Sequence, residues 1–463
     1  MATAAVFANL AFLLGALGLS ALLIFWRYPV VGIYAVLLAA GLSEFGRIEL
    51  GEFSFLLLDL VALSVLGIWV LKKIVRKERF QFGLLEGSLI GFWLFALISL
   101  LLNEGALSPA EFQFAFLFWA RFVVLSGIFL VVRELAKQEA QQKIILLGII
   151  FTGIILTLLS FGLLQIFPNF AEAGLTELGF DPHIGRLTGP FLDPNFFAGA
   201  LTIFLSLIGG QFLVTVKKKQ QIFWLSLAGV LLVAFFLTFS RSGLLALATA
   251  GFILGSLKNR KLLLGLVISA VLAGLFVPRL QDRLGELHQS LTALGSESQQ
   301  VLDPTAELRV RSWEEGLTIW QAQPILGVGF GAYKFHQNFV QEVAHSATGS
   351  DASLITVLAT TGLGGLILFL FFWISLLWEL GKKRSSGLAL GALAGILGIF
   401  VHAVFVNAFF FAPILAILLI VGALGSRANC AELQEQNCRR FFGNSQLSVG
   451  TESQGQVSKF WVY

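Results

Sequence analysis

Residues 194–219 read PNFFAGALTIFLSLIGGQFLVTVKKK, and this stretch decides the fold class. The run that precedes the three lysines has no charged side chain and exceeds the roughly 18–20 residues that an α-helix needs to cross a bilayer core. The lysines at 217–219 then stop it, as basic residues do on the cytoplasmic side of a membrane. The stretch therefore predicts a membrane helix over residues 191–215.

The composition of the whole chain agrees with this reading. Of its 463 residues, 57% are hydrophobic and 13% charged, and the mean hydropathy is +0.86; soluble domains carry about 25% charged residues. We expect an all-α, polytopic membrane protein with 12 or 13 transmembrane helices. The predicted spans are 4–26, 28–43, 53–71, 83–102, 111–132, 143–167, 191–215, 221–238, 242–257, 261–277, 353–378 and 387–426, the last long enough for two spans with a break near Asn407 and Pro413.

The loops predict the orientation, because lysine and arginine fall in every second loop. The basic loops are 72–79, 133–143, 217–219, 258–261 and 382–384, and the loops between them are acidic or neutral. By the positive-inside rule the basic loops are cytoplasmic. Residues 168–190, 239–243 and 278–352 are then extracytoplasmic.

This orientation divides the chain into four parts. Residues 1–277 hold the first ten helices, with the first apolar segment read as a retained helix. Residues 278–352 form the one large extracytoplasmic segment, expected as short helices, one of which opens at Asp303-Pro304 as N-cap and first residue. Residues 353–426 hold the last helices, and residues 427–463 form a polar tail predicted to be disordered. The two cysteines, Cys430 and Cys438, lie in this tail and indicate no metal or redox site.

The first candidate site lies at the outer start of the 191–215 helix. Asp193-Pro194 suits a helix start, which places Asn195 in the first turn, with Arg186 a few residues upstream. Helix N-termini favour anions and arginine binds phosphate in a bidentate manner. The alternative is that Arg186 reaches to lipid headgroups and that Asn195 simply caps the helix.

Two further arginine motifs face the same side. Ser240 and Arg241 lie between two spans with almost no loop, against the positive-inside bias, although an interfacial arginine in a tight turn is an equal alternative. In ELRVRSWEEGLTIWQAQPILGVGFG (307–331), Arg309 and Trp313 share one helical face, whereas Arg311 points elsewhere and is placed to pair with Glu315. The GVGFG run follows a helix and lacks the dinucleotide-binding spacing, so it predicts a tight turn.

Histidines and buried charges complete the candidate residues. His345 and Asp351 lie just before the 353–378 span, where histidine can act as a general base; a solvated loop histidine is the simpler reading, and His183 is a weaker candidate. Asp59, Arg121 and His402 fall inside predicted spans, where such groups mark either a functional site or polar helix–helix pairing.

The ordered set of motifs resembles the O-antigen ligase and O-antigen polymerase superfamily over roughly residues 180–380. The matching positions are Arg186, Gly189, Phe191, Pro194, Asn195 and Ala198; then Ser240, Arg241 and Gly243; then Arg309, Trp313, Pro324, Gly327, Gly329 and Gly331. The late histidine of the family corresponds to His345, although the register that usually holds it is occupied here by Asp351-Ala352.

The resemblance implies a glycosyltransferase of the bacterial inner membrane, acting at the extracytoplasmic face. It would transfer a glycan from an undecaprenyl-diphosphate carrier to a hydroxyl of a saccharide, lipid or protein acceptor, as a ligase or a polymerase. Arg186, Asn195, Arg241, Arg309 and Arg311 would bind the carrier, and His345 or Asp351 would act as base. Neither a cofactor, a metal nor a nucleic-acid partner is expected, since arginines can stabilise the departing diphosphate.

Two other functions are compatible with a polytopic membrane chain. A transporter of a small anion such as bicarbonate should show inverted repeats and broken helices near the midplane, and the sequence shows no clear repeat. A structural scaffold leaves the outward arginines unexplained.

Overall fold

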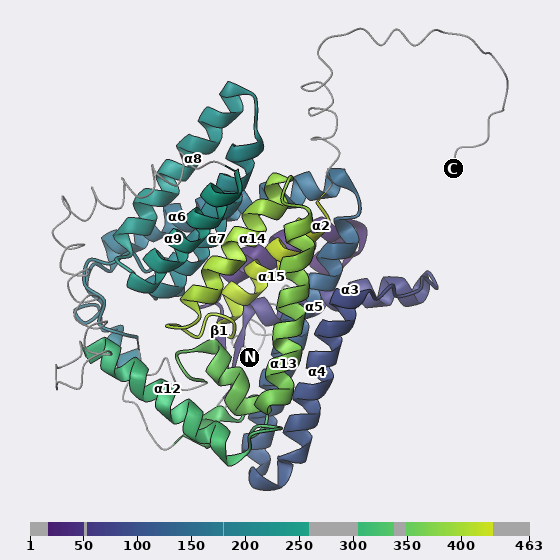
Figure 1. Cartoon of the computed structure of the whole chain (residues 1–463), viewed down its shortest axis with the longest axis vertical. Helices are drawn as coiled ribbons and strands as arrows, with labels where there is room; N and C mark the ends of the chain where they lie inside the picture. The colour runs from purple at the N-terminus through teal and green to yellow at the C-terminus, as the bar shows by residue number, and fades with distance from the viewer. Residues whose placement is uncertain (1–16, 51–52, 179, 259–303, 338–348, 429–463) are drawn as a thin grey trace, which may run out of the picture.

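The fold is described by a computed structural model that covers residues 17–50, 53–178, 180–258, 304–337 and 349–428. Helices dominate these residues and pack as a bundle (Figure 1). Six are long and apolar enough to cross a membrane: α4 (Leu84–Leu102), α5 (Pro109–Leu135), α6 (Glu139–Ile166), α7 (Pro194–Val214), α8 (Lys218–Leu237) and α13 (Ser353–Lys382). The predicted all-α, polytopic membrane fold is therefore confirmed.

Shorter or more polar helices occupy most of the other predicted spans. They are Leu17–Arg27, α2 (Pro29–Gly41), α3 (Leu57–Val75), α9 (Arg241–Lys258), α14 (Gly387–His402) and α15 (Ala412–Ser426). The long apolar stretch 387–426 does break into two helices, with Asn407 in the connection and Pro413 in the first turn of α15. The predicted span 261–277 and the tail 429–463 lie outside the described residues.

One predicted span starts differently from expectation. The helix predicted from residue 53 begins at Leu57, because β2 (Phe53–Leu56) precedes it and pairs antiparallel with β1 (Arg47–Leu50). The Asp59 carboxylate accepts a hydrogen bond from the Leu56 backbone N–H at 2.9 Å, and this cap fixes the first turn of α3 four residues later than expected.

Helices α7 and α14 pack backbone against backbone, because glycines line their interface. A Cβ placed on Gly391 would lie 2.7 Å from the Leu207 Cα, and one on Gly210 would meet the carbonyl of Gly387. Close approach through small residues is how membrane helices maximise packing. The two helices run antiparallel, so the start of α7 lies beside the end of α14.

Two of the basic loops meet the end of α13 at one end of the bundle. Lys73 forms an ion pair with Glu134 (2.7 Å), and the buried Arg133 bonds to Glu86 (2.8 Å) and Glu379 (3.2 Å). These contacts join loops 72–79 and 133–143 to the end of α13, before loop 382–384. The starts of α7, α9 and α13 lie at the opposite end.

The segment predicted as extracytoplasmic contributes a 19-residue helix, α12 (Pro304–Ala322), which begins at Pro304 as predicted. Figure 1 shows α12 across the end of the bundle beside α13. The GVGFG run that follows is a turn, as expected, with positive φ at Gly327, Gly329 and Gly331. It hydrogen-bonds to α13 through Val328 N–H to Ala359 O (3.0 Å), next to a kink at Gly362.

Candidate functional site

The start of α7 has the geometry that the sequence predicts. The Asp193 carboxylate accepts hydrogen bonds from the backbone N–H groups of Asn195 (2.6 Å) and Phe196 (3.0 Å), and Pro194 is the first helical residue. Two amides of the helix start are thus already bonded to Asp193. An anion at this position would be held mainly by side chains.

Two of the predicted arginine motifs meet at this helix start. The Arg186 Nε donates to the Thr238 carbonyl oxygen at 3.0 Å, and the neighbouring Leu187 N–H donates to Leu237 O at 2.8 Å. The Ser240 hydroxyl donates to Asn195 Oδ1 at 2.8 Å. Arg186, Asn195 and the Ser240-Arg241 pair therefore belong to one cluster, although they come from separate segments of the chain.

Glycine at position 243 lets α9 reach this cluster. Arg241 is the first residue of α9, and the Ser240 hydroxyl accepts from the Gly243 N–H at 3.2 Å. A Cβ on Gly243 would lie 2.6 Å from the Ala198 Cβ of α7. The S-R-x-G motif thus combines a serine cap with a close helix–helix contact.

The third motif reaches the cluster from α12. The Ser312 hydroxyl accepts from the Asp351 N–H at 3.0 Å, and the Ser350 hydroxyl donates to Ser312 O at 3.1 Å. These bonds fasten the buried start of α13 to α12. Arg309, one helical turn before Ser312, acts electrostatically on the ring of His402, and the ring of Trp313, the residue after Ser312, lies 6.1 Å from that of Phe405.

The remaining predicted residues are Arg311 and His345. Arg311 is exposed and forms an ion pair with Glu307, one turn earlier on α12. His345 lies outside the described residues.

His402 is a residue of this region to which the sequence assigned no role. Its side chain is fully buried, and a Cβ on Gly199 would lie 3.1 Å from its Nε2. The sequence signal was an ionisable group inside a span. For Asp59 and Arg121 that signal reflects pairing, since Arg121 Nε donates to Asp59 Oδ1 at 2.9 Å.

Carboxylates adjoin the cluster as well. Burial raises the pKa of Glu44, whose nearest charges include Arg47, Arg121 and Asp193. Burial also raises the pKa of the Tyr333 phenol, and the charges of Glu315 and Asp351 raise it further.

One group of side chains has the composition of a cation site. The potential ligand atoms of Asp181, His183 and Asp193 all lie within 4.8 Å of one another. Asp193 already serves as the helix cap, so a bound cation would share its carboxylate with two backbone amides.

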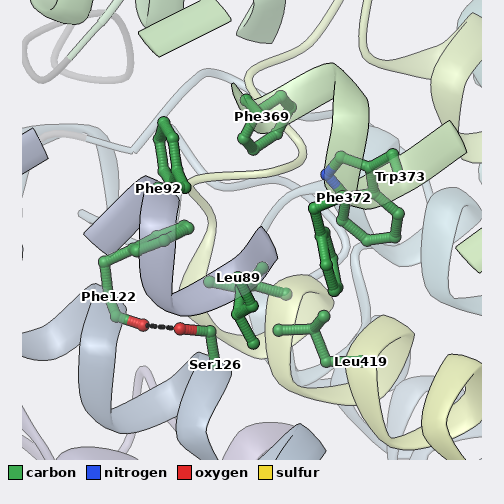
Figure 2. Close-up of a pocket in the computed structure, with 9 residues that line it drawn as sticks. Leu89, Phe92, Phe122, Ser126, Phe369, Phe372, Trp373 and Leu419 are labelled. Carbon is green, nitrogen blue, oxygen red and sulfur yellow. Dashed lines mark hydrogen bonds between the residues drawn. The ribbon is translucent and has the colours of Figure 1, made fainter. Parts of the chain in front are cut away.

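A small apolar cavity lies elsewhere in the bundle. Its volume is about 10 Å³, room for about one water molecule, and it is lined mostly by Phe, Leu and Trp side chains of α4, α5, α13 and α15 (Figure 2). Its one hydroxyl, that of Ser126, donates to the Phe122 carbonyl at 2.5 Å. With no ionisable group in its lining, it is a gap in the core packing and not the candidate site.

Residues 226–370 match the family model of the O-antigen ligases. This region is similar to the O-antigen ligase domain. It contains Ser240, Arg241, Arg309 and Asp351, while Arg186 and Asn195 precede it and His402 follows it. The match confirms the resemblance to the O-antigen ligase and polymerase superfamily and indicates glycan transfer of that general type. The search of curated proteins found no match.

Proposed function

We propose that this protein is a metal-independent glycosyltransferase of the bacterial inner membrane. It transfers a glycan from an undecaprenyl-diphosphate carrier to an acceptor hydroxyl at the extracytoplasmic face. The observation that carries the proposal is the convergence of Arg186, Asn195 and Ser240-Arg241 at one helix end, within and beside the region similar to the O-antigen ligase domain.

The arginines serve the departing group. When the glycosidic bond to the carrier breaks, negative charge grows on the diphosphate, and fixed guanidinium groups stabilise that charge without a metal. Arg241 and Arg309 provide the main contacts, and Arg186 adds one from the turn that it holds against Thr238. Arg311, exposed and paired with Glu307, makes a weaker contact further out.

The acceptor lies on the α12–α13 side of the cluster. The sequence predicts His345 or Asp351 as the group that takes the proton from the acceptor hydroxyl. Asp351 stands at the buried junction of α12 and α13, where the Ser312 bonds hold its backbone.

The test is transfer by the purified protein in lipid nanodiscs, with undecaprenyl-diphosphate glycan as donor and candidate saccharide acceptors. We expect release of undecaprenyl diphosphate together with a glycosylated acceptor, unchanged by EDTA. Arg241→Ala and Arg309→Ala should each lower turnover roughly 100-fold or more, the usual effect of removing one charge-stabilising group.

Arg76→Ala is the matched control, because Arg76 is exposed at the opposite, basic end of the bundle and pairs with Glu78. It should leave turnover unchanged. Anion uptake into liposomes without glycan turnover would instead support a transporter and refute the proposal.

A further inference from the structure

His402 has hydrogen-bonding capacity that the described part of the chain does not use. Its side chain is 0% exposed, and neither Nδ1 nor Nε2 makes a well-aligned hydrogen bond with a described residue, although backbone groups of Ser242 and Asn195 lie close to the ring. A neutral imidazole offers one donor and one acceptor. Buried polar groups are normally paired, so an unpaired one calls for a ligand or a catalytic role.

The packing of three helices places this imidazole within the candidate site. The antiparallel α7–α14 interface sets it against Gly199, one turn into α7 from Asn195. The Ser353 N–H donates to Ala403 O at 2.9 Å, which ties the start of α13 to the residue after His402. The ring therefore stands between the carrier-binding cluster of α7 and α9 and the start of α13.

Trp313 of α12 and Asn407 of the connection between α14 and α15 also carry unused polar atoms. Trp313 Nε1 and Asn407 Oδ1 are buried and lack partners among the described residues. Trp313 packs near Phe405, and Asn407 Nδ2 would lie 2.5 Å from a Cβ on Gly349, just before α13. An acceptor that bears several hydroxyl groups would satisfy such a set.

We propose that His402 is the proton acceptor of the glycan transfer, a role that rests on the function proposed above. The acceptor O–H proton passes to a ring nitrogen of His402, and the freed oxygen lone pair forms the bond to the anomeric carbon. The bond from that carbon to the carrier oxygen breaks, and its electron pair leaves with the diphosphate, which the arginines bind.

The neutral imidazole can accept a proton through a ring nitrogen lone pair, and histidine is the side chain that most often acts as a general base. Charged groups on the elements around the end of α14 are Asp193 before α7, Arg241 of α9, Arg309 of α12 and Asp351 before α13. Of these, Arg309 and Asp193 act directly on the ring.

The experiment compares His402→Gln, His402→Ala and the control His336→Gln in the nanodisc transfer assay. His336 is a partly buried histidine whose Nδ1 lies 3.1 Å from Ala332 O, away from the cluster. We expect His402→Gln to lower kcat roughly 100- to 10,000-fold, with little change in donor affinity measured by binding of the labelled carrier. The acid limb of the wild-type kcat–pH profile should disappear. Added imidazole should restore part of the activity of His402→Ala, and His336→Gln should behave as wild type.

The outcomes separate this inference from the proposed function. If wild type transfers glycan and Arg309→Ala abolishes transfer, but His402→Gln keeps its kcat and its acid limb, then His402 is not the base. Retained donor binding by His402→Gln shows that the variant is folded. If His402→Ala binds donor but imidazole does not rescue it, while Asp351→Asn or His345→Gln removes the acid limb, the proton acceptor is one of those residues. If wild type transfers nothing, the proposed function itself fails.

Discussion

At the scale of single residues, buried polar groups in this protein differ in how they are bonded. Arg133 at the basic end is paired with Glu86 and Glu379, and removing one partner of such a pair is costly because it leaves a buried charge unpaired. His402, Trp313 and Asn407 at the opposite end keep buried atoms without partners among the described residues, as Gln141 and Arg427 do near the basic end. What distinguishes His402 is that its unused bonding capacity lies beside the arginine cluster.

Asp193 shows how one side chain prepares the site. We expect Asp193→Ala to lower the free energy of unfolding by about 1 kcal/mol through loss of the helix cap, and to lower turnover roughly 10–100-fold because Asn195 loses its fixed position. Asp193→Asn, which keeps an accepting oxygen, should retain both. Thermal unfolding in detergent and the transfer assay measure the two effects.

Ser108→Ala provides the comparison, because Ser108 caps α5 by accepting from the Glu111 N–H at 3.4 Å, outside the cluster. Ser108→Ala should lower the free energy of unfolding without a specific loss of turnover. Equal turnover losses in Asp193→Ala and Ser108→Ala would contradict a special role for the α7 start.

Glu44 should make stability depend on pH. Burial raises its pKa in the folded protein above the ordinary value of 4.5, with Arg47 and Arg121 opposing the shift. The folded state then binds the proton more tightly than the unfolded state, so this contribution is present below pH 4.5 and is lost as pH rises through the folded pKa. We expect Glu44→Gln to match wild type at pH 4 and to melt higher at pH 7. A melting difference that is independent of pH would refute this account.

At the scale of elements, glycines decide where helices can meet. Gly362 has φ +63° and ψ −167° inside α13, and a Cβ there would clash with the Ile325 carbonyl oxygen. The same kink receives the GVGFG turn, whose Val328 N–H bonds to Ala359 O. The turn after α12 and the start of α13 are therefore held together by backbone contact.

Gly362→Ala should disrupt that contact. We expect a loss of about 1–3 kcal/mol from backbone strain alone, and a loss of turnover because Arg309 and Asp351 would no longer be held by the same junction. Gly381→Ala in the same helix is the control, since nothing lies within 4 Å of its added Cβ. Detergent melting curves of the two variants measure the difference, and similar curves would show that the kink is dispensable.

At the scale of the whole molecule, the sequence predicted the membrane helices correctly because one general rule applies to them. Charge-free runs such as 194–216 must be helical in a bilayer, because every backbone group has to be bonded within the segment. The helix start at Pro194 and the break before Pro413 followed from local chemistry. The pairing of β1 with β2 was missed, because the residues of β2, Phe53–Leu56, continue directly into the hydrophobic run of α3.

The site was harder to predict than the fold. The sequence supplied candidate arginines but did not show which of their motifs meet, since the contact of Asn195 with Ser240 spans 45 residues. His402 gave the same signal as Asp59 and Arg121, an ionisable group in a span. Only three-dimensional packing separates a paired charge from an unpaired imidazole.

Sidedness is the property on which the proposed function depends, and it can be tested on the whole molecule. Basic loops joined through Lys73 and Arg133 occupy one end of the bundle, and the arginine cluster occupies the other. In a background with Cys430 and Cys438 changed to serine, we expect a membrane-impermeant maleimide to label Arg311→Cys, an exposed position on α12, from the extracytoplasmic side of intact cells. Arg384→Cys, exposed in a basic loop, should react only after permeabilisation. The reverse pattern would put the cluster in the cytoplasm, where a carrier whose glycan has already crossed the membrane could not reach it.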